Sequence, residues 1–217
     1  MSMSRKPESQ PDSRIESVSR RTTLKMGASL ATALVTPAIV HASAPHKRTL
    51  RMQSLNSGES LTVTYWADGK YLAEADAPIA HFMRDLRSHE VHPIDRRLLD
   101  FMWEVDELTP STNPLYTLSG FRSASTNALL VSRSEDVDSN SFHLRGMAID
   151  LTQDFLDPEA LFRVARSLKR GGTGFYPTDR PFVHMDVGPV DVWIWPEKGR
   201  PNRAAEYDRM MEPAAKG

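Results

Sequence analysis

An imidazole and a carboxylate lie seven positions apart in the segment 141–150, at His143 and Asp150. Gly146 lies between them, and from Met147 onward large apolar residues alternate with small or charged ones. A period of two is typical of a half-buried strand, so Asp150 is expected to face away from the core. A histidine in a turn and a carboxylate on the next strand can bind one metal ion if the chain folds back. Two ligands leave such a site incomplete.

The segment 182–187 offers a third ligand. Its alternate residues are apolar, which places His184 and Asp186 together on the opposite face of a strand. If both strands join one sheet, His143, Asp150 and His184 supply two imidazoles and a carboxylate. Three protein ligands, with the fourth position left to water, are the pattern of a catalytic zinc site. The alternative is two unrelated surface histidines beside structural carboxylates.

Arg122 lies in a turn, between the glycine that follows a short strand and a serine suited to cap a helix. Such a turn either presents the guanidinium to a cleft or leaves it as a surface arginine, and spacing alone does not decide between them. The histidines at 81, 89 and 92 straddle a helix end and a proline, which favours solvated side chains over ligands. The glycines of 171–174 follow a helix and precede a strand, the reverse of a phosphate-binding loop.

Predicted strands and helices follow one another along the chain and must position these side chains. A hairpin with an Asp-Gly turn is expected over residues 48–72. Apolar spacing and capping residues predict helices over 78–88, 95–108, 125–131 and 158–169, with short strands at 115–118, 147–151 and 182–187. We therefore expect an α+β fold, with a small antiparallel sheet and helices on one side.

The amino terminus has the three parts of an export signal. Arg20 and Arg21 precede an uncharged segment of about 15 residues, 26–40, which is shorter than the ~20 needed to span a bilayer. Small residues at 42–44 suit cleavage, and the arginine pair resembles a twin-arginine signal. We expect a signal over 1–44, one domain over 45–217 with a charged tail at 197–217, and a periplasmic monomer without stable membrane insertion.

Charge and cysteine content exclude several classes of protein. Residues 45–217 contain 21 basic and 25 acidic residues, a net charge of −4 without a basic stripe, so no nucleic-acid partner is expected. The chain has no cysteine, which excludes disulfides, thiolate metal sites and cysteine nucleophiles. Any metal must be held by nitrogen and oxygen ligands.

Four motifs in order carry a family resemblance. They are Ser119–Ser123 (SGFRS), Ser141–Asp150 (SFHLRGMAID), Gly172–Pro177 (GTGFYP) and Phe182–Asp186 (FVHMD). Together they resemble the M15 family of zinc peptidases, with its D-alanyl-D-alanine peptidase and hedgehog-like fold, and within it the exported murein endopeptidase K-like branch. The resemblance covers nearly all of residues 48–190. Phe121 stands where tyrosine is usual, and Thr173 where valine is common.

The resemblance implies a role for each matching residue. His143, Asp150 and His184 correspond to the Zn²⁺ ligands, and Arg122 to the arginine that binds substrate and stabilises the developing oxyanion. Ser141 corresponds to the serine beside the metal loop. We expect Ser141 and Tyr176, with Arg122, to bind substrate.

The general base has no such match. Many relatives carry a catalytic acid three residues before the last histidine, where this chain has Pro181. Asp186 is then our candidate for the base, and its alternative role is to orient a metal ligand.

The resemblance implies an exported zinc peptidase that cleaves amide bonds in the peptide cross-links of peptidoglycan. Pro181 favours an alternative, a non-catalytic peptidoglycan-binding module with the same fold. A cofactor-loaded redox protein is a second alternative, which the missing cysteines and the missing dinucleotide motif argue against. The motifs leave open which bond is cut, at a 3-3 or a 3-4 cross-link, and whether the cut is internal or terminal.

Overall fold

The computed structural model describes residues 47–109, 111–134, 137–153 and 157–195. The predicted export signal at 1–44 and the tail at 197–217 lie outside these ranges. The chain divides into two units, residues 1–42 and 43–217, and every described element belongs to the second.

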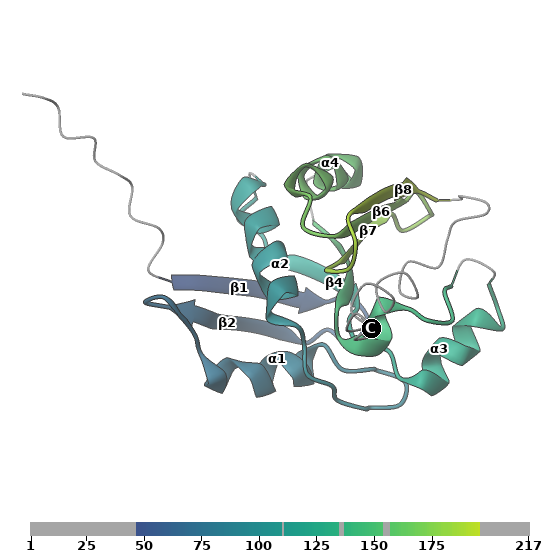
Figure 1. Ribbon diagram of the computed structural model, residues 1–217, viewed down its shortest axis with the longest axis horizontal. Helices are drawn as coiled ribbons and strands as arrows, with labels where there is room; N and C mark the ends of the chain where they lie inside the picture. Colours follow the sequence, from purple (N-terminus) through teal and green to yellow (C-terminus); the bar gives the residue numbers. More distant parts are fainter. Residues whose placement is uncertain (1–46, 110, 135–136, 154–156, 196–217) are drawn as a thin grey trace, which may run out of the picture. The chain divides into compact units, whose positions relative to one another are not determined.

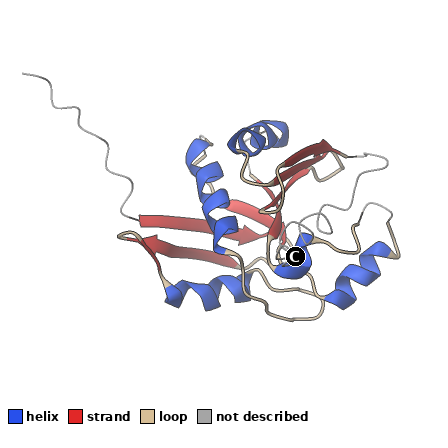
Figure 2. Ribbon diagram, viewed as in Figure 1, coloured by secondary structure: helices blue, strands red, loops and turns tan. Residues whose placement is uncertain are grey.

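Eight strands form one sheet in the order β3-β2-β1-β4-β5-β7-β6-β8 (Figure 1, Figure 2). The strands are β1 (Lys47–Ser54), β2 (Ser60–Ala67), β3 (Lys70–Tyr71), β4 (Leu115–Ser119), β5 (Ala148–Thr152), β6 (Gly172–Tyr176), β7 (Phe182–Asp186) and β8 (Asp191–Ile194). The helices are α1 (Asp76–Phe82), α2 (Arg96–Leu108), α3 (Ala124–Val131) and α4 (Pro158–Leu168), with single 3-10 turns η1 (Ala73–Ala75) and η2 (Phe142–Arg145). The α+β class is confirmed.

The expectation of a small antiparallel sheet was wrong. The pairs β1–β4 and β6–β8 are parallel, and the other neighbours are antiparallel. Two helices, α1 and α2, lie between β1 and β4 along the chain, and a helical connection of this length permits a parallel pair. The hairpin prediction for 48–72 is confirmed, since β1, β2 and β3 are antiparallel neighbours and Asp68 and Gly69 turn with φ of 48° and 82°.

The largest differences from the prediction are the end of α1 and the strands β6 and β8. Helix α1 ends at Phe82 instead of Ser88, because the carboxylate of Asp85 accepts hydrogen bonds from the backbone N–H groups of Arg87 and Ser88. A side chain that satisfies these donors offers the backbone an alternative to the helix. The glycine-rich segment is itself strand β6, and β8 was not predicted.

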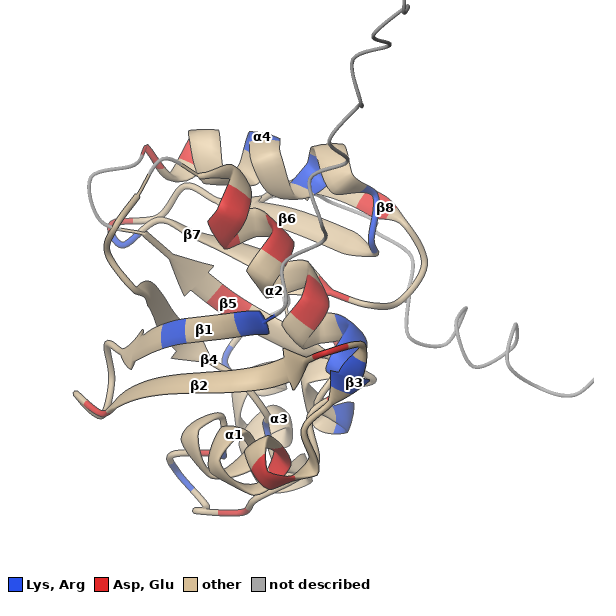
Figure 3. Cartoon of the chain, turned by 90° about the vertical axis from the view of Figure 1, so that its left-hand side faces the viewer, with Lys and Arg blue, Asp and Glu red and all other residues tan. Residues whose placement is uncertain are grey.

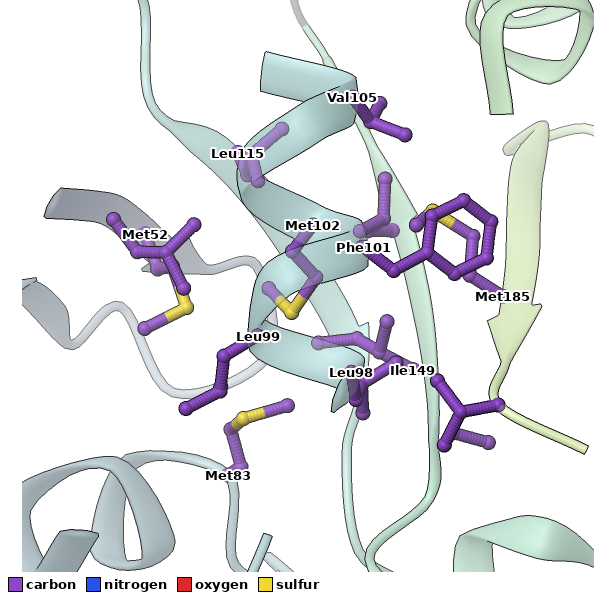
Figure 4. Close-up of a cluster of buried hydrophobic side chains, with 14 of the residues drawn as sticks. Met52, Met83, Leu98, Leu99, Phe101, Met102, Val105, Leu115, Ile149 and Met185 are labelled. Carbon is purple, nitrogen blue, oxygen red and sulfur yellow. The ribbon is translucent and has the colours of Figure 1, made fainter. Parts of the chain in front are cut away.

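The core lies between α2 and the sheet. Helix α2 buries Leu98, Phe101, Met102 and Val105, as periodic apolar spacing predicts. Figure 4 shows these side chains against apolar residues of β1, β4, β5 and β7: Met52, Leu115, Ile149 and Met185. Helix α4 packs against β6 and β7 and buries Leu161, Phe162 and Ala165.

The side chains of β5 and β7 alternate across the sheet. Ile149, Leu151, Val183 and Met185 face the core, which leaves Asp150, His184 and Asp186 on the opposite face. Figure 3 shows basic residues on β1, mainly acidic residues along α2 and both kinds on α4.

Candidate metal centre

The three predicted ligands meet on this polar face. Asp150 is paired directly with His184 in the register of β5 and β7, and η2 brings His143 over them. Asp150 Oδ1 lies 2.9 Å from His184 Nδ1 and 3.3 Å from His143 Nε2, and the two nitrogens are 3.2 Å apart. Donors of a tetrahedral zinc ion are separated by about 3.3–3.4 Å, given bonds of ~2.0–2.1 Å. The donor set and its spacing therefore fit a zinc ion.

Each histidine has its second ring nitrogen engaged. His143 Nδ1 lies 2.6 Å from the carbonyl oxygen of Gly120, an atom that can only accept a hydrogen bond. His184 Nε2 donates to Asp186 Oδ2 at 3.1 Å. Metal-binding histidines are oriented in this way in proteins, because the proton on one nitrogen leaves the other nitrogen for the metal. In the neutral form of each ring, the nitrogen without a proton is the one that faces Asp150.

The charges around the cluster favour metal binding at His143 and Asp150. Burial, followed by the positive charge of Arg122, lowers the pKa of His143 to about 4, so its imidazole is neutral at neutral pH. Burial opposes ionisation of Asp150, but His143 and Arg122 outweigh it and hold the pKa of Asp150 well below its ordinary value.

His184 is protonated more readily than an ordinary histidine. Burial lowers its pKa, but its hydrogen bonds to Asp150 and Asp186 outweigh that effect and raise the pKa above 6.5. A metal ion must displace the proton that Nδ1 carries in this state.

Arg122 lies at the edge of the cluster. Of the two placements that the sequence left open, a cleft and the surface, this agrees with the first. Its Nη2 donates to Asp150 Oδ2 at 2.5 Å and lies 3.1 Å from His143 Nε2, and its Nε donates to Ser119 Oγ at 3.0 Å. The turn that carries Arg122 is fixed on both sides: its backbone N–H donates to the carbonyl of His143, and that of Ser123 donates to Asp85.

Asp186 is fully buried, with 0% of its surface exposed. Its Oδ1 accepts hydrogen bonds from the backbone N–H groups of Gly172 and Gly188, at 3.2 and 2.8 Å, and its Oδ2 accepts from His184. The structure brings Asp186 to the outer side of the His184 ring, away from the nitrogen that faces His143 and Asp150.

The two predicted substrate-binding residues lie at different places. Ser141 is buried and caps η2, where its hydroxyl accepts a hydrogen bond from the backbone N–H of His143. Tyr176 stacks on Phe182 with ring centroids 4.5 Å apart, and its hydroxyl accepts a hydrogen bond from Trp193 Nε1. The Trp193 ring lies 5.4 Å from that of His184, which links Tyr176 to the metal centre.

Two contributors to the site were missed in the sequence. Trp193 fits beside β6 only because residue 174 is glycine: a Cβ there would lie 2.2 Å from the indole. Asp85 holds the turn that carries Arg122. Two features of the sequence could have indicated them: a tryptophan that follows the last motif, and an aspartate inside the expected helix 78–88. Within the part of the chain that the structure describes, the histidines at 81, 89 and 92 join no metal-binding group.

A mixed sheet with a His-Asp-His cluster on its polar face defines an α+β protein with a three-ligand candidate metal centre. The family model described as peptidoglycan L,D-endopeptidase MepK, of the peptidase M15 group, matches residues 42–193. The chain belongs to this M15 peptidase family.

Named relatives agree with this assignment. The chain is 34% identical to the peptidoglycan L,D-endopeptidase MepK of Escherichia coli K12 over 160 residues, which cover 74% of this chain and 87% of the relative. It is 33% identical to the probable peptidoglycan L,D-endopeptidase MepK of Haemophilus influenzae over 152 residues, 70% of this chain and 81% of the relative. No solved structure gives a significant match. None of the described helices is long and apolar enough to cross a membrane.

Proposed function

We propose that this chain is an exported zinc-dependent endopeptidase that hydrolyses L,D amide bonds in the peptide cross-links of peptidoglycan. The observation that carries the proposal is the His-Asp-His cluster, whose three donor atoms lie 2.9–3.3 Å apart. The printed activity of the relatives supports the substrate class and the L,D bond. It also favours internal cleavage over carboxypeptidase activity, which the motifs alone left open.

His143 and His184 would hold the ion through Nε2 and Nδ1, and Asp150 through Oδ1. When bound, zinc polarises a carbonyl oxygen and lowers the pKa of a bound water to ~7, so that a nucleophile is available at neutral pH. Asp150 Oδ2 remains for Arg122, which keeps the guanidinium beside the centre. There Arg122 can donate hydrogen bonds to a substrate carbonyl and to the negative charge that develops on it.

We assign Asp186 the orienting role instead of the base. Its burial and its hydrogen bonds support this choice, because the carboxylate is shielded from solvent and both of its oxygens already accept hydrogen bonds. The carboxylate fixes the His184 ring and its tautomer. Ser141 acts similarly on His143 through the cap of η2, and Tyr176 contributes to an aromatic wall along the substrate path.

The twin-arginine motif at Arg20 and Arg21 supports export to the periplasm, where peptidoglycan is accessible to a folded enzyme. We propose that the signal covers residues 1–44 and that the exported protein is a monomer.

Digestion of purified cross-linked muropeptides, followed by mass spectrometry, tests the proposal. The wild-type protein should convert L,D-linked dimers into monomers that have gained one water, and the His143→Ala variant should not. Intact dimers after prolonged incubation with the zinc-loaded protein would contradict it.

Incubation of the protein with whole sacculi separates a second candidate, a peptidoglycan-binding module without catalysis. Pro181 favours this candidate, because an acid is common in relatives at that position. Retention of the protein on sacculi without new fragments would establish binding alone, whereas new fragments establish an enzyme.

A further inference from the structure

A pocket of about 340 Å³ lies beside the metal centre, with which it shares Arg122. It is bounded by the turn after α1, the end of β4 and helix α3. Phe121 and Leu130 contribute apolar walls, and Arg87 contributes a charged one. At ~30 Å³ for each water, the pocket has room for about ten water molecules, which is enough for one amino-acid residue.

The other charges that line this pocket are already compensated. Arg84 donates two hydrogen bonds of 2.9 Å to the carboxylate of Glu59. Asp85 is buried, and its oxygens accept from the backbone N–H groups of Arg87, Ser88 and Ser123. Neither group therefore offers a free charge to a ligand.

Two guanidinium groups differ from this pattern. Arg87 is exposed, and its side chain makes no hydrogen bond or ion pair to any residue that the structure describes. Arg122 uses Nε and Nη2 on Ser119 and the metal centre, while its Nη1 has no hydrogen-bond partner within the described ranges. The pocket thus presents unpaired arginine donors next to the place where an amide would be cut.

We propose that this pocket is a subsite for a free carboxylate on the peptide residue adjacent to the scissile amide, with Arg87 as its principal binding residue. The proposal rests on the proposed function and names the part of the substrate that the pocket recognises. Arginine's planar fork matches a carboxylate with two parallel hydrogen bonds. A residue joined through its side-chain amine keeps its α-carboxyl out of the cross-linking amide, so that carboxylate is free wherever the peptide ends at this residue. Phe121 and Leu130 would contact the aliphatic part of the same residue.

Calorimetric titration of the full zinc-loaded chain with an uncross-linked muropeptide tests the subsite without any cleavage. A second titration uses the same muropeptide with its carboxylates amidated. The Arg87→Ala substitution should weaken binding of the carboxylate form about tenfold, because loss of one charge-assisted hydrogen bond costs ~1.5 kcal/mol. It should weaken binding of the amidated form by less than about twofold. Arg87→Lys should retain part of the affinity. Arg163→Ala, an exposed arginine on α4 away from the pocket, is the matched control and should change neither titration.

Two outcomes would overturn the subsite: equal effects of Arg87→Ala on both muropeptides, or no effect on either. Failure of the proposed function would give a different combination of cleavage and binding results. If the protein cleaves no cross-linked dimer yet binds the carboxylate form through Arg87, the subsite stands and the endopeptidase assignment fails. If it cleaves dimers but binds both muropeptides equally in every variant, the endopeptidase stands and the subsite fails.

Discussion

Each histidine of the centre has one ring nitrogen held by a neighbouring acceptor, the carbonyl of Gly120 for His143 and the carboxylate of Asp186 for His184. The opposite nitrogens then point to Asp150. Because both rings are oriented before any metal arrives, little side-chain entropy is lost on binding. The fixed orientation of both rings therefore supports metal binding by this cluster.

The Asp186→Asn substitution separates orientation from base catalysis. The amide oxygen can still accept from Gly172 and Gly188, but the amide NH₂ then faces His184 Nε2 and favours the tautomer with a proton on Nδ1. We expect zinc affinity to fall by about 10–100-fold, with activity partly restored at high zinc. Zinc affinity is measured by competition with a chromogenic chelator.

A base at Asp186 would give the opposite result: zinc affinity close to that of the wild type, and activity lower by about 10²–10⁴-fold at any zinc concentration. Asp179→Asn, at an exposed position outside the cluster, is the control and should alter neither quantity.

Metal binding should also depend on pH through His184. Its pKa lies above 6.5 in the metal-free protein, so below that pKa a proton on Nδ1 must leave before the metal binds. Zinc affinity should therefore fall about tenfold per pH unit as the pH drops below the pKa of His184, and level off above it. Because the pKa of Asp150 is well below 3.8, that carboxylate adds no second proton between about pH 5 and 7. Zinc titrations over this range would contradict the account if affinity were constant.

At the scale of elements, two turns hold the arginine of the site. Residues 83–88, after α1, contact the turn 120–123 through three interactions: Met83 accepts from the N–H of Phe121, Asp85 accepts from Ser123, and Gly120 packs on the Met83 backbone so closely that a Cβ would lie 2.6 Å from its carbonyl oxygen. The early end of helix α1 therefore lets residues 83–88 fix the turn that carries Arg122.

Replacement of Asp85 by asparagine should destabilise the protein by about 1–3 kcal/mol, because an amide cannot accept from all three backbone N–H groups. Burial raises the pKa of Asp85, but its hydrogen bonds outweigh this and hold the pKa below 3.8. The contribution is present above about pH 4 and is lost as the pH falls toward the folded-state pKa. Urea denaturation should show a smaller difference between wild type and variant at pH 3 than at pH 7, and an equal difference at both would count against it.

A second pair of elements, β6 and β8, supports His184 from the side. Gly174→Ala should cost about 1–3 kcal/mol, because the new methyl group overlaps the Trp193 indole. Trp193→Leu alone should cost about 2–4 kcal/mol through lost packing. If the overlap is the cause, urea denaturation should show that the double variant loses less free energy of unfolding than the sum of the two single losses. Losses that are strictly additive would rule this explanation out.

Periodicity sufficed for the elements whose apolar residues repeat without interruption, such as α2, α4, β5 and β7. It failed where a side chain overrides local preference, as Asp85 does at the end of α1. It also failed at β6, because the glycine-rich segment favours a loop whereas the strand begins at Gly172. The parallel pairing of β1 with β4 is a tertiary property with no local signal. The shared face of Asp150 and His184 could be predicted, because a period of two assigns each residue to one side of its strand. The burial of Asp186 and its hydrogen bond from Gly172 could not be predicted, because they depend on strand β6, a separate segment.

At the scale of the whole molecule, the match to the M15 family covers residues 42–193 and so includes the hairpin, the core and the metal centre together. The polar face of one sheet carries the three candidate ligands, the aromatic side chains beside them and, through Arg122, the neighbouring pocket. This concentration on one face suits a substrate that is a polymer network, because a network cannot enter an enclosed cavity. Hydrolysis should therefore depend on a metal held by His143, Asp150 and His184.

The most direct test follows L,D-linked muropeptide cleavage and metal content in the same sample while the metal is removed and returned. The purified protein should contain about one zinc per chain, lose cleavage when a chelator removes it, and recover cleavage when one equivalent is added back. The His143→Ala and Asp150→Ala variants should neither retain zinc nor recover. Undiminished cleavage by protein shown to be free of metal would contradict the account.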